Sequence, residues 1–107
     1  MQPKFDAYEQ GFGAELLCPN CGFNYLHHDQ VEIFERNEDA LSGLHVVVDD
    51  GRLSTDTSLS GNPSSRRHGL NIRFWCEGCK AISILSIAQH KGNTLVDFTH
   101  NGEPDDE

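Results

Sequence analysis

Hydrophobic and polar residues alternate over short stretches of this chain. The clearest example is residues 70–74, where Leu, Ile and Phe alternate with Asn and Arg. A period of two places the apolar side chains on one face of a β-strand, whereas a helix would repeat about every 3.6 residues. Strands are predicted over residues 12–17, 23–27, 30–36, 44–48, 70–74, 81–89 and 95–98. No stretch has the pattern of a long helix, so we expect an all-β or β-dominated small domain with antiparallel strands.

One predicted strand contains an irregularity in its alternation. Within residues 81–89 the apolar positions shift from Ile82 and Ile84 to Leu85 and Ile87. An extra residue in one strand of an antiparallel pair produces such a shift, because two residues then oppose one on the partner strand. We therefore predict a β-bulge near Ile84 and Leu85.

Polar and glycine-rich stretches connect or flank these strands. Residues 49–51 end in Asp-Gly, which is typical of a tight turn, and residues 90–93 predict a second turn. Residues 51–69 are rich in Ser, Thr, Gly and Asn without any strand or helix period, and they predict one long mobile loop. Residues 1–11 predict a loose N-terminal arm and residues 101–107 an acidic tail. The whole chain is expected to form a single domain.

Composition narrows the class of protein. The chain has 107 residues, of which 36% are hydrophobic, and this suits one compact domain with a modest core. No secretory signal is recognised at the start, and the longest apolar-leaning stretch, residues 81–88, is far shorter than the about 20 residues of a membrane helix. We therefore expect a cytoplasmic protein without a membrane partner.

The charge of the chain is negative and unevenly distributed. The formal net charge is −9, with −8 on residues 1–65 and +3 on residues 66–100. A field of this sign repels nucleic acid, except at a sharply localised basic patch. The acidic N-terminal half is suited to a basic surface on a protein partner.

The four cysteines form two CxxC pairs, Cys18 with Cys21 and Cys76 with Cys79. This spacing lets both sulfurs of a tight turn point at one ion, and two such turns complete a tetrahedral four-sulfur shell. We predict one structural Zn²⁺ at these residues. A redox dithiol, two disulfides and an iron centre are the alternatives. A redox CxxC needs a helix N-terminus to stabilise its thiolate, and the sequence predicts no such helix.

Residues 17–22 (LCPNCG) and 74–79 (FWCEGC) resemble the two zinc knuckles of zinc-ribbon proteins. The resemblance covers the knuckles and their flanking strands. Because 54 residues separate Cys21 from Cys76, it implies an elaborated zinc-ribbon-like domain with inserted strands over the whole chain. The chain is also similar in general character to small uncharacterised bacterial and phage zinc-ribbon proteins. Zinc ribbons serve in many unrelated proteins, so the resemblance implies metal binding without naming a function.

The histidines give no clear second site. They are His27, His28, His45, His68, His90 and His100. Adjacent His27 and His28 would point to opposite faces of a strand and could not easily chelate together. A metal-dependent nuclease of the HNH type also carries paired CxxC motifs, and His90, Asn93 and His100 match its residue types but lack its helix. We predict no catalytic residue.

One basic segment is the remaining candidate. Arg66, Arg67, Arg73 and Trp75 could contact a protein partner or nucleic acid, with the arginines gripping phosphates and the indole stacking on a base. The arginines could equally pair with the protein's own acids, and Trp75 could belong to the core. The leading hypothesis is a non-enzymatic, zinc-stabilised binding or regulatory module that docks on a protein partner. A nucleic-acid-binding ribbon is the alternative, and exposed strand edges allow a homodimer.

Overall fold

The computed structural model describes residues 1–8, 10, 11 and 13–100. Over these residues the protein is all-β, as predicted, and contains no helix. Its strands are β1 (Phe5–Ala7), β2 (Ala14–Leu16), β3 (Leu26–Glu35), β4 (Leu44–Asp49), β5 (Arg52–Asp56), β6 (Gly69–Cys76), β7 (Ile82–His90) and β8 (Asn93–His100). The predicted acidic tail, residues 101–107, lies outside the described residues.

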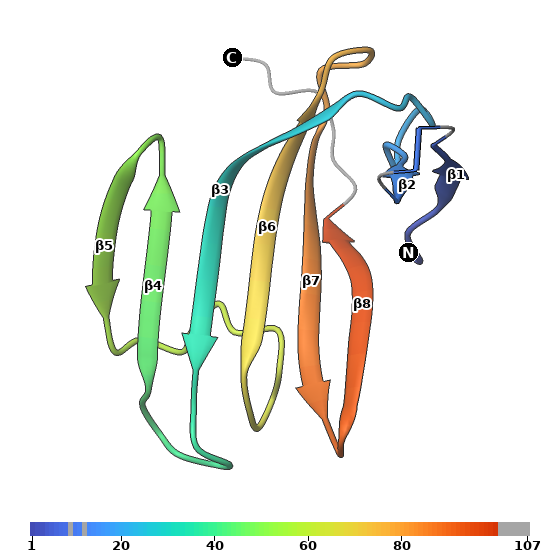
Figure 1. Ribbon diagram of the computed structural model, residues 1–107. Helices are drawn as coiled ribbons and strands as arrows, with labels where there is room; N and C mark the ends of the chain where they lie inside the picture. The colour runs from blue at the N-terminus through green and yellow to red at the C-terminus, as the bar shows by residue number, and fades with distance from the viewer. Residues whose placement is uncertain (9, 12, 101–107) are drawn as a thin grey trace.

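Six of these strands form one antiparallel sheet in the order β5-β4-β3-β6-β7-β8, with β3 and β6 at its centre (Figure 1). The small β1–β2 sheet lies beside one end of it. The strands predicted over residues 30–36, 44–48, 70–74, 81–89 and 95–98 overlap β3, β4, β6, β7 and β8. The alternation of apolar and polar residues predicted these strands correctly because each strand contributes apolar side chains to one common face of the sheet.

The predicted turns and bulge are also present. Residues 50–51 join β4 to β5 with φ angles of 53° and 76°, and residues 91–92 join β7 to β8 with 51° and 84°. Positive φ at both central residues is the geometry of a type I′ turn, whose twist matches that of the strands it connects. The register between β7 and β8 shifts between Ile84 and Leu85, which confirms the bulge.

The prediction of one long mobile loop over residues 51–69 is wrong for its first part, because Arg52–Asp56 forms β5 on the outer edge of β4. All side chains of β5 are exposed, so no alternation of burial marks it in the sequence. The remaining residues, 57–68, are held against the sheet. Ser64 is only 4% exposed, and its hydroxyl donates a hydrogen bond of 2.8 Å to the carbonyl oxygen of Gln89.

The loose arm predicted over residues 1–11 is also wrong in part. Strand β1 pairs with β2 in register, and the N–H of Phe98 in β8 donates to the carbonyl oxygen of Met1 at 2.8 Å. These bonds fasten the N-terminal segment to the edge of the large sheet. Strand β2 covers the centre of the strand predicted over residues 12–17, and residue 12 lies outside the described residues.

The large sheet has two different faces. One of them, which we call the aliphatic face, carries two rows of side chains that run across all six strands. The first row is Leu53, Val48, Val31, Ile72, Leu85 and Phe98, and the second is Thr55, Val46, Ile33, Leu70, Ile87 and Val96. Every member except Thr55 is apolar.

The opposite face, which we call the polar face, carries a hydrogen-bonded row with one residue from each strand. In order from β5 to β8 the row is Asp56, His45, Glu32, Asn71, Ser86 and Thr99, with bonds of 2.7 to 3.2 Å. Phe34 is buried beside it and stacks on the His45 ring at 4.5 Å. The loop of residues 57–68 lies on this face, where the Asn71 side-chain amide donates to the carbonyl oxygen of Gly61 at 2.9 Å.

Candidate metal centre

The segment that follows β2 folds into the first cysteine turn. The N–H of Cys18 donates to the carbonyl oxygen of Phe23, and the N–H of Gly22 donates to the carbonyl oxygen of Cys18, both at 2.9 Å. Gly22 closes the turn with φ of 80°, a left-handed conformation that glycine adopts without a Cβ clash. The turn thereby presents Cys18 and Cys21 on the same side.

The second turn, between β6 and β7, repeats this pattern. The N–H of Cys76 donates to the carbonyl oxygen of Ala81 at 3.1 Å, and the N–H of Lys80 donates to that of Cys76 at 3.0 Å. In each turn the first cysteine is therefore bonded to the residues four and five positions later. Lys80 occupies the place of Gly22 and also has a positive φ, of 65°. The two cysteine pairs therefore lie on turns with the same pattern of backbone hydrogen bonds.

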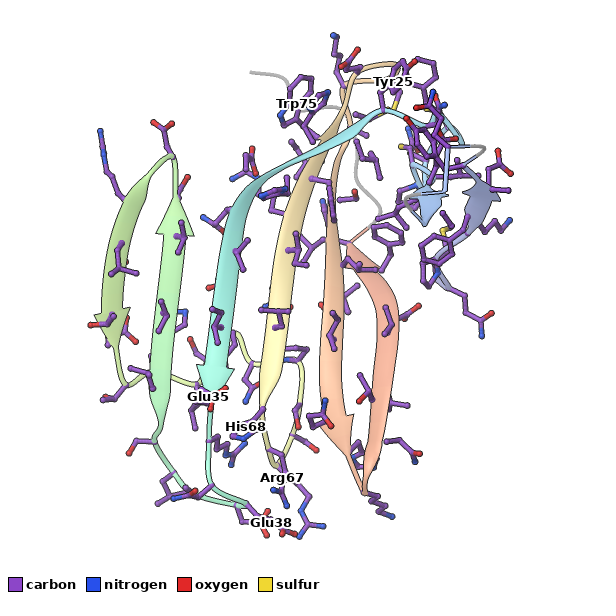
Figure 2. The ribbon with its side chains drawn as sticks, in the orientation of Figure 1. Tyr25, Glu35, Glu38, Arg67, His68 and Trp75 are labelled. Carbon is purple, nitrogen blue, oxygen red and sulfur yellow. The ribbon has the colours of Figure 1, made fainter. Side chains whose placement is uncertain are left out.

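Strand pairing brings the two turns together at one end of the sheet. Leu26 at the start of β3 lies opposite Cys76 at the end of β6. The pairing continues beyond the strands, because the N–H of Glu77 donates to the carbonyl oxygen of Tyr25 at 3.1 Å. Figure 2 shows Tyr25 at this end, next to the sulfur atoms. The sheet thus fixes one turn relative to the other.

The four cysteines have the spacing of ligands around a single ion. Their Sγ atoms all lie within 4.8 Å of one another, and the distances are 3.8 Å from Cys18 to Cys79 and 3.6 Å from Cys21 to Cys76. A tetrahedral ion with metal–sulfur bonds of about 2.3 Å has sulfurs about 3.8 Å apart, whereas a disulfide needs about 2.05 Å. All four predicted metal ligands therefore lie together, and their geometry favours a metal over disulfides.

The sulfurs differ in their readiness to ionise. Burial raises the pKa of the Cys18 thiol to about 12, against the opposing effect of backbone hydrogen bonds from Cys21 and Asn20. Burial also acts on Cys79, but hydrogen bonds from the Asn20 side chain and the backbone of Ala81 outweigh it and lower the pKa of Cys79 to about 6. The Asn20 amide nitrogen lies 3.3 Å from Cys79 Sγ. Since the thiolate is the metal-binding form, Asn20 supports a ligand.

The donor set fits a metal ion. Four sulfurs in a tetrahedral arrangement are typical of zinc or iron sites in proteins. Cys76 is fully buried and Cys18 nearly so, while Cys21 is exposed. Among the described residues, this is the one group of three or more cysteine, histidine or acidic side chains close enough to hold an ion.

Two members of the predicted contact set, Arg66 and Arg67, precede β6 at the end far from the metal centre. Figure 2 shows Arg67 at the far end of the sheet, separated by the length of β6 from Trp75 near the cysteines. Arg66 forms ion pairs with Glu38 at 2.7 Å and with Asp39 at 2.8 Å, and Arg67 contacts Glu38 at 3.3 Å. Arg66 and Arg67 are therefore paired with the protein's own acids, which is the alternative that the sequence left open.

The other two members of the predicted contact set lie on β6. Arg73 has its Nε atom 3.6 Å from a carboxylate oxygen of Asp29. The indole of Trp75 stacks on the His27 ring with centroids 4.5 Å apart and an interplanar angle of 18°. One face of the indole is thus already covered by a side chain of the protein itself.

The histidines do not converge with an asparagine as a nuclease centre would require. His90 lies opposite Asn93 at the β7–β8 turn, but His100 is at the other end of β8. His45 is held on the polar face between the carboxylates of Glu32 and Asp56. The described histidines therefore have separate surroundings.

The aliphatic face is a candidate binding surface that the sequence did not reveal. At the end far from the metal centre, a pocket of about 680 Å³ is hollowed into this face. Ile33, Leu70 and Ile87 lie along it, and Arg67 and Lys91 are among the charged residues at its rim. We call it the basic hollow. The available signal was that several consecutive predicted strands have an apolar face, while the sequence predicts no helix that could cover it.

A second pocket lies at the opposite end of the same face and is bordered by acids. Its volume is about 520 Å³, and it is lined by Val31 and Val48 of the aliphatic rows together with Asp29, Asp49 and Asp50. We call it the acidic hollow. The basic hollow is lined by three bases and two acids and the acidic hollow by three acids and no lysine or arginine, so the two ends of the face differ in charge.

Comparisons of the chain with models of protein families, with curated proteins and with solved structures found no match. The residues that the structure describes form no helix capable of spanning a membrane. The function is therefore inferred from the metal centre and from the surfaces of the molecule itself.

Proposed function

We propose that this protein is a non-enzymatic, zinc-stabilised binding module that docks on a protein partner through its aliphatic face. The observation that carries the proposal is a six-stranded sheet with two apolar rows, which no described segment covers over β3, β4 and β5. A sheet normally buries its apolar face against another layer of structure. The partner would supply the missing layer.

Zinc is the ion that the cysteine cluster suits best. Structural zinc sites commonly use four cysteines in tetrahedral geometry, and the two turns have the matching sulfur separations. The ion would join the β2–β3 segment to the β6–β7 turn and so fasten the small sheet to the large one. Because such a site does not form in the unfolded chain, its binding free energy contributes directly to folding.

A structural role also follows from the ligand count. Catalytic zinc sites keep one coordination position for water or substrate, but four protein sulfurs fill a tetrahedral shell. None of the four cysteines would remain as a free nucleophile. These features support a binding protein over an enzyme.

The exposure of the aliphatic face supports docking. Leu53 is 69% exposed, Val48 41% and Val96 40%. Six strands spaced by about 4.8 Å, each running for about 15 to 30 Å, give a face of roughly 600 Å² in projection. Part of this face is already covered, because Leu85 is only 8% and Phe98 only 3% exposed. The largest apolar patch on a typical monomer measures about 300 to 600 Å². In Figure 1 no described segment lies in front of β5, β4 and β3, while the 57–68 loop passes behind.

A protein partner is favoured over nucleic acid. Nucleic acid would need a concentrated basic surface, but Arg66 and Arg67 are paired with Glu38 and Asp39 on a chain of net charge −9. The exposed aliphatic side chains Leu53, Val48 and Val96 suit the fully buried centre of a protein interface.

Adjacent residues of β4 provide a matched test. Val48 belongs to the aliphatic face, whereas its neighbour Val47 points to the polar face. A photo-crosslinking amino acid placed at Val48 in cells should give a crosslinked protein product, and the same group at Val47 should not. Equal products at both positions, or none at Val48, would contradict docking through the aliphatic face.

A further inference from the structure

We propose that the occupant of the aliphatic face is a second copy of this chain, so that two sheets pack face to face as a symmetric β-sandwich. The inference rests on the proposed function and names the partner. It differs from a dimer formed through strand edges, since the contact is made by side chains of the face and no strand is added to the sheet.

The composition of the face is self-complementary. Its two central rows, which run across six strands, carry no charged side chain. A two-fold symmetric interface places the same patch on both subunits, so any charge near the axis would meet its like. An uncharged aliphatic surface avoids that repulsion even though each chain carries net charge −9. Sheets of this kind pack about 10 Å apart with interdigitating side chains.

The area also reaches what a stable dimer needs. A standard interface buries about 800 Å² on each partner. The face offers roughly 600 Å² in projection, and the accessible surface of pleated strands with protruding side chains is larger than its projection. The two hollows lie toward opposite ends of the strands and are lined in part by members of the two rows, so they belong to this area.

The two hollows define how the copies are oriented. Along the strands, Lys91 and Arg67 lie at one end of the face, and Asp49 and Asp50 lie at the other. When a two-fold axis reverses the strand direction between the sheets, each basic hollow lies over the partner's acidic hollow. The pairing occurs twice by symmetry. Copies packed with strands in the same direction would instead bring like ends together.

Of the residues that the structure describes, Lys91 is the main unpaired positive charge at the basic hollow. Arg66 is neutralised by its ion pairs with Glu38 and Asp39, and Glu35 also lines this hollow. Lys91, at the tip of the β7–β8 turn, has no carboxylate within ion-pairing distance among the described residues. Lys91 is thus free to pair with a partner's acid.

The test is sedimentation velocity of the zinc-loaded full chain over a range of concentrations. We expect a monomer–dimer equilibrium that Val48→Asp shifts to monomer. Val47→Asp, on the polar face of the same strand, is the matched control and should leave the dimer intact. Zinc content and thermal unfolding of each variant establish that it is folded. A protein that is monomeric at every concentration, or a dimer unaffected by Val48→Asp, would overturn the inference.

A charge exchange between exposed residues tests the orientation, and the unfolding temperature of each variant establishes that it is folded. Lys91→Glu and Asp50→Lys should each raise the dimer dissociation constant by about 2- to 30-fold, since an exposed ion pair formed twice contributes that much. The double variant Lys91→Glu/Asp50→Lys should recover the wild-type constant. Additive weakening in the double variant would refute the reversed packing.

Failure of the second copy can be told apart from failure of docking itself. If the protein is monomeric while a crosslinker at Val48 captures a different protein, the dimer is overturned and the proposed function stands. A crosslinked product of twice the chain mass supports both. Monomer together with no product at Val48 overturns both.

Discussion

Asn20 supports the metal centre from outside, and its removal should weaken metal binding without unfolding the protein. Its side-chain nitrogen lies 3.3 Å from Cys79 Sγ, where it donates a hydrogen bond to a ligand sulfur. Loss of such an outer-shell partner typically lowers metal affinity by about 10- to 100-fold. Since tenfold corresponds to about 1.4 kcal/mol, Asn20→Ala should lose about 1.4 to 2.7 kcal/mol of zinc-binding free energy. Asn20→Asp should lose more, because it places a carboxylate beside thiolates.

Competition with a chromophoric chelator measures these affinities. Asn24→Ala is the matched control, because Asn24 follows the same turn but donates to Glu15, at 3.4 Å, and not to a sulfur. We expect the control to bind zinc like the wild type. The unfolding temperature of the zinc-loaded Asn20 variant should fall in parallel, since binding and folding are coupled. An Asn20→Ala affinity equal to that of the control would refute a supporting role for Asn20.

Three further predictions test the backbone, the loop and the polar face. Lys80→Gly should raise the free energy of unfolding by about 1 kcal/mol, because lysine is strained at φ 65° and glycine is not. Lys80→Ala should give no such increase, since alanine keeps the Cβ atom. Equal melting temperatures of the two variants would contradict this explanation. Gly69→Ala should cost about 1 to 3 kcal/mol in urea unfolding, since its Cβ would lie 2.7 Å from Cδ of Pro63, while Ser65→Ala on the exposed side of the loop should change stability by less than about 0.5 kcal/mol. Equal costs would show that the loop does not pack on the sheet. For His45, burial lowers the pKa but the two neighbouring carboxylates outweigh it and raise it. Its stabilisation is therefore fully present below about pH 6.5 and is lost as pH rises through the raised pKa, so the stability gap between wild type and His45→Gln should narrow above about pH 6.5. A gap that widens with pH would be the opposite result.

Much of the fold follows from local sequence signals. The CxxC spacing determines a tight turn, and its residue types bind metal, so the four ligands could be named without knowing the sheet. Alternation located the central strands because their two faces differ in polarity. The slip from Ile84 to Leu85 also indicated the position of the bulge, but the extra residue is Thr99 of β8, which lies between the pairs Ile84–His100 and Leu85–Phe98, while β7 pairs with β6 in unbroken register.

Other parts depend on partners that the sequence does not reveal. Strand β5 is exposed throughout and polar, so it is a strand only because the turn at residues 50–51 returns it along β4. Arg66 was a candidate for contacting a partner because its own ion-pair partners, Glu38 and Asp39, are about 28 residues away in the chain. The sequence alone does not show that these acids lie beside it. The exposure of the aliphatic face is a property of the assembled sheet, and it appears only when the strand order is known.

The central claim is one zinc ion held by four cysteine sulfurs, and X-ray absorption spectroscopy of the purified protein tests it most directly. We predict a zinc edge and a first shell of four sulfurs at about 2.3 Å. A first shell that contains nitrogen or oxygen at about 2.0 to 2.1 Å, or a protein without zinc whose cysteines are joined in disulfides, would contradict it.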